Sequence, residues 1–103
     1  MKKYSVIVPV YNRPKELEEL LESLSLQSYS NFEVIIIEDG STETGENVVK
    51  SYSDRLDILY YYKDNSGPGD SRNVGMQKAN GEYLLFFDSD CLIPPQYLSL
   101  IHI

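Results

Sequence analysis

Two aspartates, Asp88 and Asp90, stand two positions apart directly after a short apolar run at positions 83–87. The run follows a glycine and is too short for a helix of its own, so it predicts a strand that is buried on both faces. On an extended backbone, side chains two positions apart project to the same side. Two carboxylates that converge at a strand end suit Mg²⁺ or Mn²⁺, because these hard cations prefer oxygen ligands. A solvent-exposed acidic turn is the alternative interpretation, since Asp-Ser-Asp is ordinary loop chemistry.

Polar residues follow the other predicted strands in the same way. They form three clusters, Pro9-Val10-Tyr11-Asn12, Glu38-Asp39-Gly40-Ser41-Thr42 and Asp70-Ser71-Arg72-Asn73-Val74-Gly75. In a parallel sheet, the carboxyl ends of all strands share one edge, and open α/β sheets bind their ligands there. Each cluster also has a plain structural interpretation, such as a strand end at Pro9, a turn at Asp39, or a surface charge at Arg72. Taken together, the clusters are expected to converge with Asp88 and Asp90 on one crevice.

Alternating strands and helices must position these clusters. Apolar runs predict strands over residues 5–10, 32–37, 56–62 and 83–87, and two further patterns predict helices over residues 45–52 and 70–79. Another helix is predicted to begin near Pro14, with Asn12 as its N-cap. Its apolar face consists of Leu17, Leu20, Leu21 and Leu24. This order of elements predicts an α/β fold in which right-handed crossovers connect the strands of a parallel sheet.

Composition narrows the classes of partner. A chain of 103 residues with a 42% apolar share fits one globular domain at most. Its 9 basic and 16 acidic residues argue against a basic surface for nucleic acid or anionic membranes. An acidic protein that binds a diphosphate needs local cations, which a carboxylate-bound metal would supply. The sequence has no signal peptide and no apolar run that could span a bilayer, so a cytoplasmic location is expected, with membrane-peripheral attachment left open for a longer parent protein.

These three clusters and Asp88-Ser89-Asp90, in the order in which they occur, resemble the nucleotide-binding half of family 2 glycosyltransferases. That family has the GT-A fold, a Rossmann-like and mostly parallel sheet with helices on both faces. The resemblance covers the chain up to about Leu98. It implies the transfer of a sugar from a nucleoside diphosphate donor, with a UDP-sugar expected, to a saccharide or other acceptor. It also implies Mn²⁺ or Mg²⁺ as a cofactor.

The resemblance further implies which residues hold the nucleotide base. Pro9 and Tyr11 would line the base pocket. Asp39 would accept a hydrogen bond from the base, typically from uracil N3, with Glu38 beside it. All four residues come from the predicted carboxyl edge of the sheet.

Other residues are assigned to the phosphates and the metal on the same grounds. Arg72 and Asn73 belong to an R-N-x-G element and would lie close to the base and the phosphates. Asp88 and Asp90 match the D-x-D motif of the family. Asp90 would be the direct metal ligand, and Asp88 would lie nearer to the ribose while still contributing to the metal site.

No catalytic residue is assigned. Inverting members of the family use a carboxylate base well downstream of D-x-D, and this sequence ends before any matching position. The chain is therefore expected to be a donor-binding fragment, truncated after the fourth strand, that transfers little or no sugar by itself. Residues 1–98 are assigned to the nucleotide-sugar-binding part of the domain, and residues 99–103 to a non-native or disordered tail.

Two alternative functions belong to other classes. A receiver-type signalling module is also a small α/β domain with an acidic Mg²⁺ pocket, but its acidic pair follows the first strand. A non-catalytic nucleotide-binding module is the other alternative for this polypeptide. A dinucleotide-binding dehydrogenase is set aside because no G-x-G-x-x-G follows the first strand, and a P-loop nucleotidase because G-x-x-x-x-G-K-[ST] does not occur.

Overall fold

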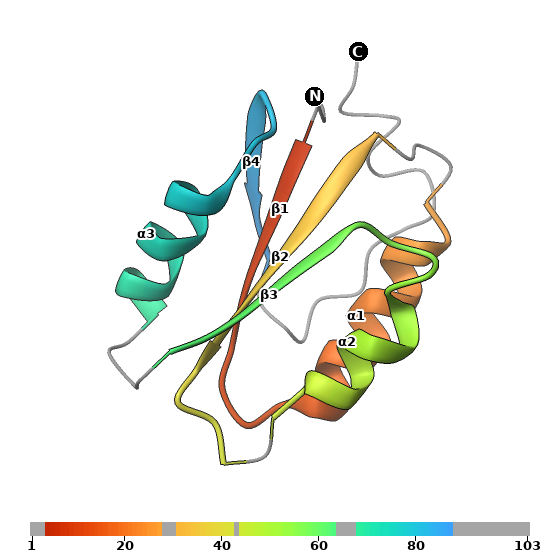
Figure 1. The fold of residues 1–103 in the computed structure, drawn as a ribbon, viewed down its shortest axis with the longest axis vertical. Coiled ribbons are helices and arrows are strands. Elements are labelled where there is room, and N and C mark those ends of the chain that lie inside the picture. The colour runs from red at the N-terminus through yellow and green to blue at the C-terminus, as the bar shows by residue number, and fades with distance from the viewer. Residues whose placement is uncertain (1–3, 28–30, 43, 64–67, 88–103) are drawn as a thin grey trace.

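Four parallel strands form the sheet at the centre of this chain. The computed structural model describes residues 4–27, 31–42, 44–63 and 68–87 (Figure 1). The strands are β1 (Tyr4–Val10), β2 (Phe32–Asp39), β3 (Ile58–Lys63) and β4 (Tyr83–Phe86), and they lie in the order β3-β2-β1-β4. The predictions for Asp88, Asp90 and residues 99–103 lie outside the described residues.

Helices cover both faces of the sheet. Helices α1 (Pro14–Ser25) and α2 (Glu46–Tyr52) lie on one face, and α3 (Pro68–Lys78) lies on the other (Figure 1). The chain builds outward from β1 to β3, and α3 then carries it back across the sheet to pair β4 with the other side of β1. The predicted α/β fold, with a parallel sheet and helices on both faces, is therefore confirmed.

The alternation of side chains along the central strands creates two cores. One face of β1 and β2 packs against α1 and α2, through residues such as Val6, Val8, Val34 and Ile36. The predicted leucine face of α1 is fully buried there. The other face presents Ile7, Ile35 and Ile37 to α3, where Val74 and Ala79 pack against them.

Gly75 lets α3 approach β1 closely, and we expect Gly75→Ala to destabilise the fold. A β-carbon at this position would overlap Cγ2 of Ile7, which is fully buried. Alanine gains about 1 kcal/mol of helix propensity over glycine, whereas overpacking a core costs about 1–3 kcal/mol. The expected net loss is about 1 kcal/mol, measured as a shift of the urea unfolding curve. Gln77→Ala, at an exposed position of the same helix, is the control. If the two variants proved equally stable, the close approach of α3 to β1 would be wrong.

The start of α1 differs from its prediction. Arg13, not Asn12, occupies the N-cap position, no side chain caps the helix, and Pro14 begins it. Asn12 instead has a positive φ of 52°, and its Oδ1 accepts a hydrogen bond from the backbone N–H of Thr42 at 2.8 Å. Asparagine tolerates this left-handed conformation better than most residues. The side chain predicted to cap a helix therefore connects two loops.

Strand β4 also differs from its prediction, because it is not buried on both faces. Tyr83, Leu84 and Phe86 are 54%, 37% and 41% exposed. Within the described part of the chain β4 pairs with β1 alone, and α3 packs on β1 and β2 rather than over β4. Leu85 and Phe87 lie on the face opposite to Leu84 and Phe86 and join the core beneath α1. The apolar composition of β4 is therefore matched by burial on one face only.

Candidate functional site

The strand order creates a switch point between β1 and β4. From β1 the chain moves first to β2 on one side, and it later returns to β4 on the other side. Open α/β sheets bind ligands outside the carboxyl ends of strands at such a point. Tyr11 and Asn12 follow β1 at this edge, and Phe87 follows β4 and donates its backbone N–H to the carbonyl of Ile7 at 3.1 Å. The β1–β4 pairing thus extends to the residue that precedes Asp88.

The residues predicted to hold the base lie at this same edge. Pro9 is half-buried in β1, and Tyr11 is 52% exposed just beyond the strand. Asp39 is the last residue of β2 and is only 5% exposed. Alternation from Ile7 and Ile37 puts Pro9 and Asp39 on the α3 face of the sheet. The fold therefore brings a proline, a tyrosine and a buried carboxylate to one end of the sheet.

The R-N-x-G residues lie on the helix that covers that face. Arg72 and Asn73 are in the second turn of α3, and the side chain of Asn73 is exposed. Two residues further along the chain, Gly75 packs against β1. The helix is thus held close to the strand whose carboxyl end carries Pro9.

Asp39 forms a buried ion pair with Lys63. The Nζ atom of Lys63 lies 2.6 Å from Oδ1 of Asp39, and the side chains are 9% and 8% exposed respectively. Both residues end their strands, and they are direct partners in the β2–β3 register. A hydrogen bond between two ionised groups is stronger than a neutral one. The pair therefore fixes the Asp39 carboxylate at the carboxyl edge of the sheet.

Glu38 lies on the opposite face, where it organises the loop after β2. Its side chain is fully buried. Oε1 accepts hydrogen bonds from the backbone N–H of Gly45 at 2.7 Å and from the hydroxyl of Tyr60 at 3.1 Å. Oε2 accepts a short hydrogen bond from the Ser41 hydroxyl. Glu38 thus lies beside Asp39 in sequence, as predicted, but its contacts are with the protein and hold Ser41 and Gly45, which follow β2.

Tyr60 remains a hydrogen-bond donor in this arrangement. Burial raises the pKa of its hydroxyl far above the ordinary value, and the negative charge of Glu38 raises it further. The phenol therefore stays protonated at neutral pH and donates to Glu38. This contact connects β3 to Glu38 of β2, the residue that also holds Ser41 and Gly45.

Two loops at the edge are joined through Ser41. The backbone N–H of Asn12 donates to the Ser41 hydroxyl at 2.8 Å, and the hydroxyl of Tyr62 donates to the Ser41 carbonyl at 3.2 Å. The Asn12 side chain accepts from Thr42 in addition. Tyr11 and Asp39 therefore flank a network that connects the ends of β1, β2 and β3.

The metal prediction falls outside the described part of the chain. Among residues 4–27, 31–42, 44–63 and 68–87, no three His, Cys, Asp or Glu side chains come together as a metal site. Asp88 and Asp90, the predicted ligands, follow directly after the described end of the fourth strand. Their role in metal binding therefore stays a prediction.

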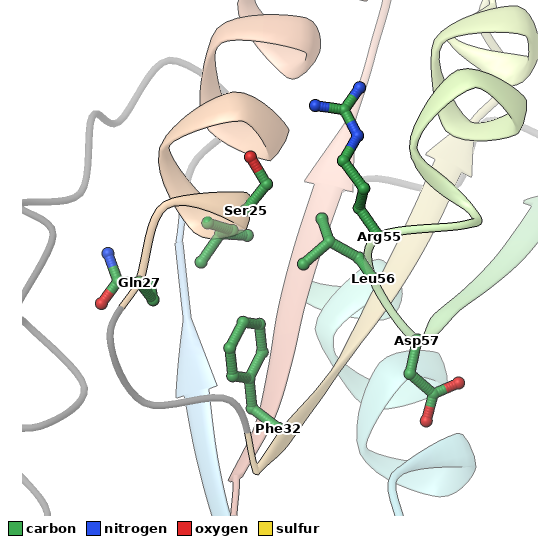
Figure 2. Close-up of a pocket in the computed structure, with 7 residues that line it drawn as sticks. Ser25, Gln27, Phe32, Arg55, Leu56 and Asp57 are labelled. Carbon is green, nitrogen blue, oxygen red and sulfur yellow. The ribbon is translucent and has the colours of Figure 1, made fainter.

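A cavity of about 170 Å³ lies at the other end of the sheet (Figure 2). Phe32 begins β2 and Asp57 immediately precedes β3, so this cavity is at the amino edge, away from the switch point. Its lining consists of Leu24, Ser25, Gln27, Phe32, Arg55, Leu56 and Asp57. Parallel sheets bind ligands at the carboxyl edge, so this cavity is not the site indicated by the topology.

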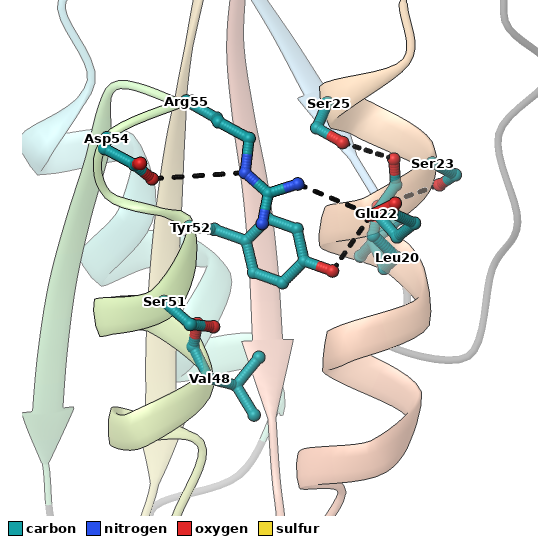
Figure 3. Close-up of polar contacts among 9 residues, drawn as sticks. All are labelled: Leu20, Glu22, Ser23, Ser25, Val48, Ser51, Tyr52, Asp54 and Arg55. Carbon is teal, nitrogen blue, oxygen red and sulfur yellow. Dashed lines mark hydrogen bonds and ion pairs between the residues drawn. The ribbon is translucent and has the colours of Figure 1, made fainter.

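Arg55 takes part in a polar cluster that joins α1 to α2 (Figure 3). The hydroxyl of Tyr52 donates to Oε2 of Glu22 at 3.0 Å, and the Arg55 guanidinium lies 3.8 Å from the same oxygen. Arg55 also covers the Tyr52 ring at 4.3 Å from its centroid, a cation–π contact. Burial raises the pKa of the Tyr52 hydroxyl, so it remains a donor. Glu22 and Arg55 therefore have a structural role here, because their contacts hold α1 and α2 together.

Known proteins resemble this chain in sequence. A sequence profile described as Glycosyl transferase family 2 matches residues 5–101. An uncharacterized glycosyltransferase of Rickettsia bellii is 46% identical over 90 residues, which cover 87% of this chain and 13% of that protein.

None of the helices in the described residues is both long and apolar enough to cross a membrane.

Solved structures show the same fold. The poly(ribitol-phosphate) β-N-acetylglucosaminyltransferase TarS of Staphylococcus aureus, in complex with UDP-GlcNAc, superimposes with a TM-score of 0.92 at 40% identity, over 97% of this chain and 30% of that chain. The mannosyltransferase PcManGT of Pyrobaculum calidifontis, in complex with GDP-Man and Mn²⁺, superimposes with a TM-score of 0.83 at 26% identity, over 89% of this chain and 28% of that chain. The chain spans less than a third of the length of each of these relatives.

Proposed function

Because this chain belongs to glycosyltransferase family 2, we propose that it binds the nucleoside diphosphate part of a sugar donor, with uridine as the nucleoside. The observation that carries the proposal is the buried Asp39 carboxylate at the carboxyl edge of β2, on the same face of the sheet as Pro9 of β1. An ionised carboxylate at this point can accept the N3–H of uracil. The TarS relative, which is 40% identical, was solved with UDP-GlcNAc, and this supports a uridine nucleotide over a guanosine nucleotide.

The remaining nucleotide contacts are assigned by the same proposal. Tyr11 is exposed at the end of β1, where its ring is available to the base. Arg72 and Asn73, on α3, are assigned to positions close to the base and the phosphates. Glu38 acts indirectly, since its contacts hold the loop after Asp39.

Divalent metal binding at Asp88 and Asp90 is part of the proposal. The PcManGT relative was solved with Mn²⁺, and in the sequence Asp88-Ser89-Asp90 comes directly after Phe87, the residue that follows β4. Bound there, Mn²⁺ or Mg²⁺ would offset the charge of the diphosphate and stabilise it as a leaving group. Two carboxylates are too few ligands for a tight site, so the diphosphate is expected to complete the coordination.

Calorimetry with UDP tests the donor and metal assignments together. We expect UDP to bind more tightly when Mn²⁺ or Mg²⁺ is added and to lose that gain with EDTA. Asp90→Ala should abolish the metal dependence, and Asp88→Ala should weaken it less. Asp54→Ala is the matched control, because Asp54 is an exposed aspartate in the turn after α2. Equal UDP affinity with and without metal, unchanged in Asp90→Ala, would overturn the metal assignment.

Residues 1–98 are proposed to form the donor-binding part of a longer glycosyltransferase. The partial coverage of every reported relative supports this division. The acceptor site and the catalytic base are then supplied by other parts of the parent protein. A receiver-type signalling module is no longer a candidate, because the family match assigns the chain elsewhere.

A further inference from the structure

We propose that Lys63 reads the nucleotide base together with Asp39 and sets a preference for uracil over cytosine. The inference rests on the proposed donor site and adds a residue to it. Lys63 ends β3 directly opposite Asp39 in the strand register, and the two side chains meet at 2.6 Å. A base that hydrogen-bonds Asp39 therefore comes within reach of the Lys63 ammonium.

The two groups present an acceptor and a donor side by side. A carboxylate only accepts hydrogen bonds, and an ammonium group only donates them. The Watson–Crick edge of uracil has a donor, N3–H, flanked by two carbonyl acceptors. In one fixed pose, uracil can donate N3–H to Asp39 while its O4 carbonyl accepts from Lys63, which is the pose that we propose.

Cytosine reverses this pattern at both atoms. Its N3 is an acceptor and would face the Asp39 carboxylate, and its exocyclic amine is a donor and would face the ammonium. A site that leaves buried polar groups without partners rejects the wrong ligand strongly. The pair therefore discriminates between two pyrimidines that stack in the same place.

Stability alone gives little reason for a buried ion pair at this position. Replacing buried ion pairs by well-packed apolar residues is often neutral or stabilising, because both charges lose hydration. The residues that precede the pair in the two strands, Ile37 and Tyr61 on the same face, are not charged. The charges appear at the last position of each strand, at the edge where the ligand is proposed to bind.

Competition binding with UDP, CDP and uridine tests this role. We expect wild-type protein to prefer UDP to CDP, and Lys63→Met to reduce that preference by about tenfold. Lys63→Gln is a second variant that keeps a donor for Asp39 and is less disruptive to folding. Its amide can rotate to present an acceptor to cytosine, so the preference should fall here too. Lys50→Met, at an exposed position on α2, is the control and should leave the preference unchanged.

The outcomes separate this inference from the proposed function. If wild-type protein binds neither UDP nor uridine, the donor site itself is wrong. If it binds UDP but Lys63→Gln keeps the wild-type ratio of UDP to CDP affinity, Lys63 does not read the base. If Lys63→Gln weakens UDP but not uridine, the ammonium contacts the phosphates, and base reading is likewise rejected.

Discussion

Glu38→Ala is expected to destabilise the chain by about 3–5 kcal/mol, because it leaves several buried donors without an acceptor. The backbone N–H of Gly45 and the hydroxyls of Tyr60 and Ser41 all donate to this carboxylate. Each buried donor left unsatisfied costs about 1–3 kcal/mol. The lost contacts also anchor the loop that follows the proposed base ligand, so nucleotide binding should weaken together with stability.

Urea unfolding of three variants measures this effect. Glu38→Gln keeps the oxygen that accepts from Gly45 and Tyr60, so its loss of stability should be clearly smaller than that of Glu38→Ala. Glu18→Ala, at an exposed position of α1, should lie within about 0.5 kcal/mol of wild type. An unfolding midpoint of Glu38→Ala that matches Glu18→Ala would show that the network contributes little.

Regular patterns made much of the fold predictable. The leucine face of α1 repeats at helical spacing and is buried, because a single amphipathic face can meet only one sheet. The apolar, β-branched runs of β1 and β2 identify central strands, since both of their faces need cover. Strand and helix order then sets the parallel topology through the handedness of the crossovers. The parallel topology alone puts the carboxyl ends of the strands, and the candidate site residues that follow them, at one edge of the sheet.

Predictions failed where several conformations suit one residue. Asn12 was expected to cap α1, but asparagine also tolerates positive φ and can bond a neighbouring loop. The choice depends on Thr42, which lies thirty positions away along the chain. β4 is partly exposed for a related reason. An apolar run predicts that a strand is buried, but it does not specify which neighbouring element covers the strand.

The parts of the site that sequence reasoning missed are cross-strand contacts. Lys63 meets Asp39 only because the β2–β3 register pairs them, and Tyr60 reaches Glu38 across the same two strands. A partial signal was present, because tyrosines that pack against a core usually find hydrogen-bond partners for their hydroxyls. The run Tyr60-Tyr61-Tyr62 therefore indicated polar partners near β3, and the hydroxyls of Tyr60 and Tyr62 find them in Glu38 and Ser41. Which partners these were depended on the register.

Asp39→Asn is expected to weaken UDP binding by about 1.5–3 kcal/mol, which corresponds to about tenfold or more in the dissociation constant. A carboxylate has two acceptor oxygens, so it can accept from Lys63 and from uracil N3–H together. The amide has a single acceptor oxygen, and its other end only donates. In the variant, Lys63 and the base therefore compete for one oxygen, and the charge that strengthens both bonds is gone.

In the Asp39→Asn variant the oxygen of the introduced amide can still accept from Lys63, but the buried ammonium loses its counter-charge, so the variant should be less stable than wild type. A thermal melt of the variant gives the temperatures at which it is folded, and calorimetry within that range separates a loss of binding from a loss of structure. Glu19→Gln makes the same chemical change at an exposed position of α1 and should bind UDP like wild type in calorimetry. Equal UDP affinities for Asp39→Asn and Glu19→Gln would reject Asp39 as the base ligand. Since Lys63 was assigned through Asp39, the base-reading pair would then be rejected as well.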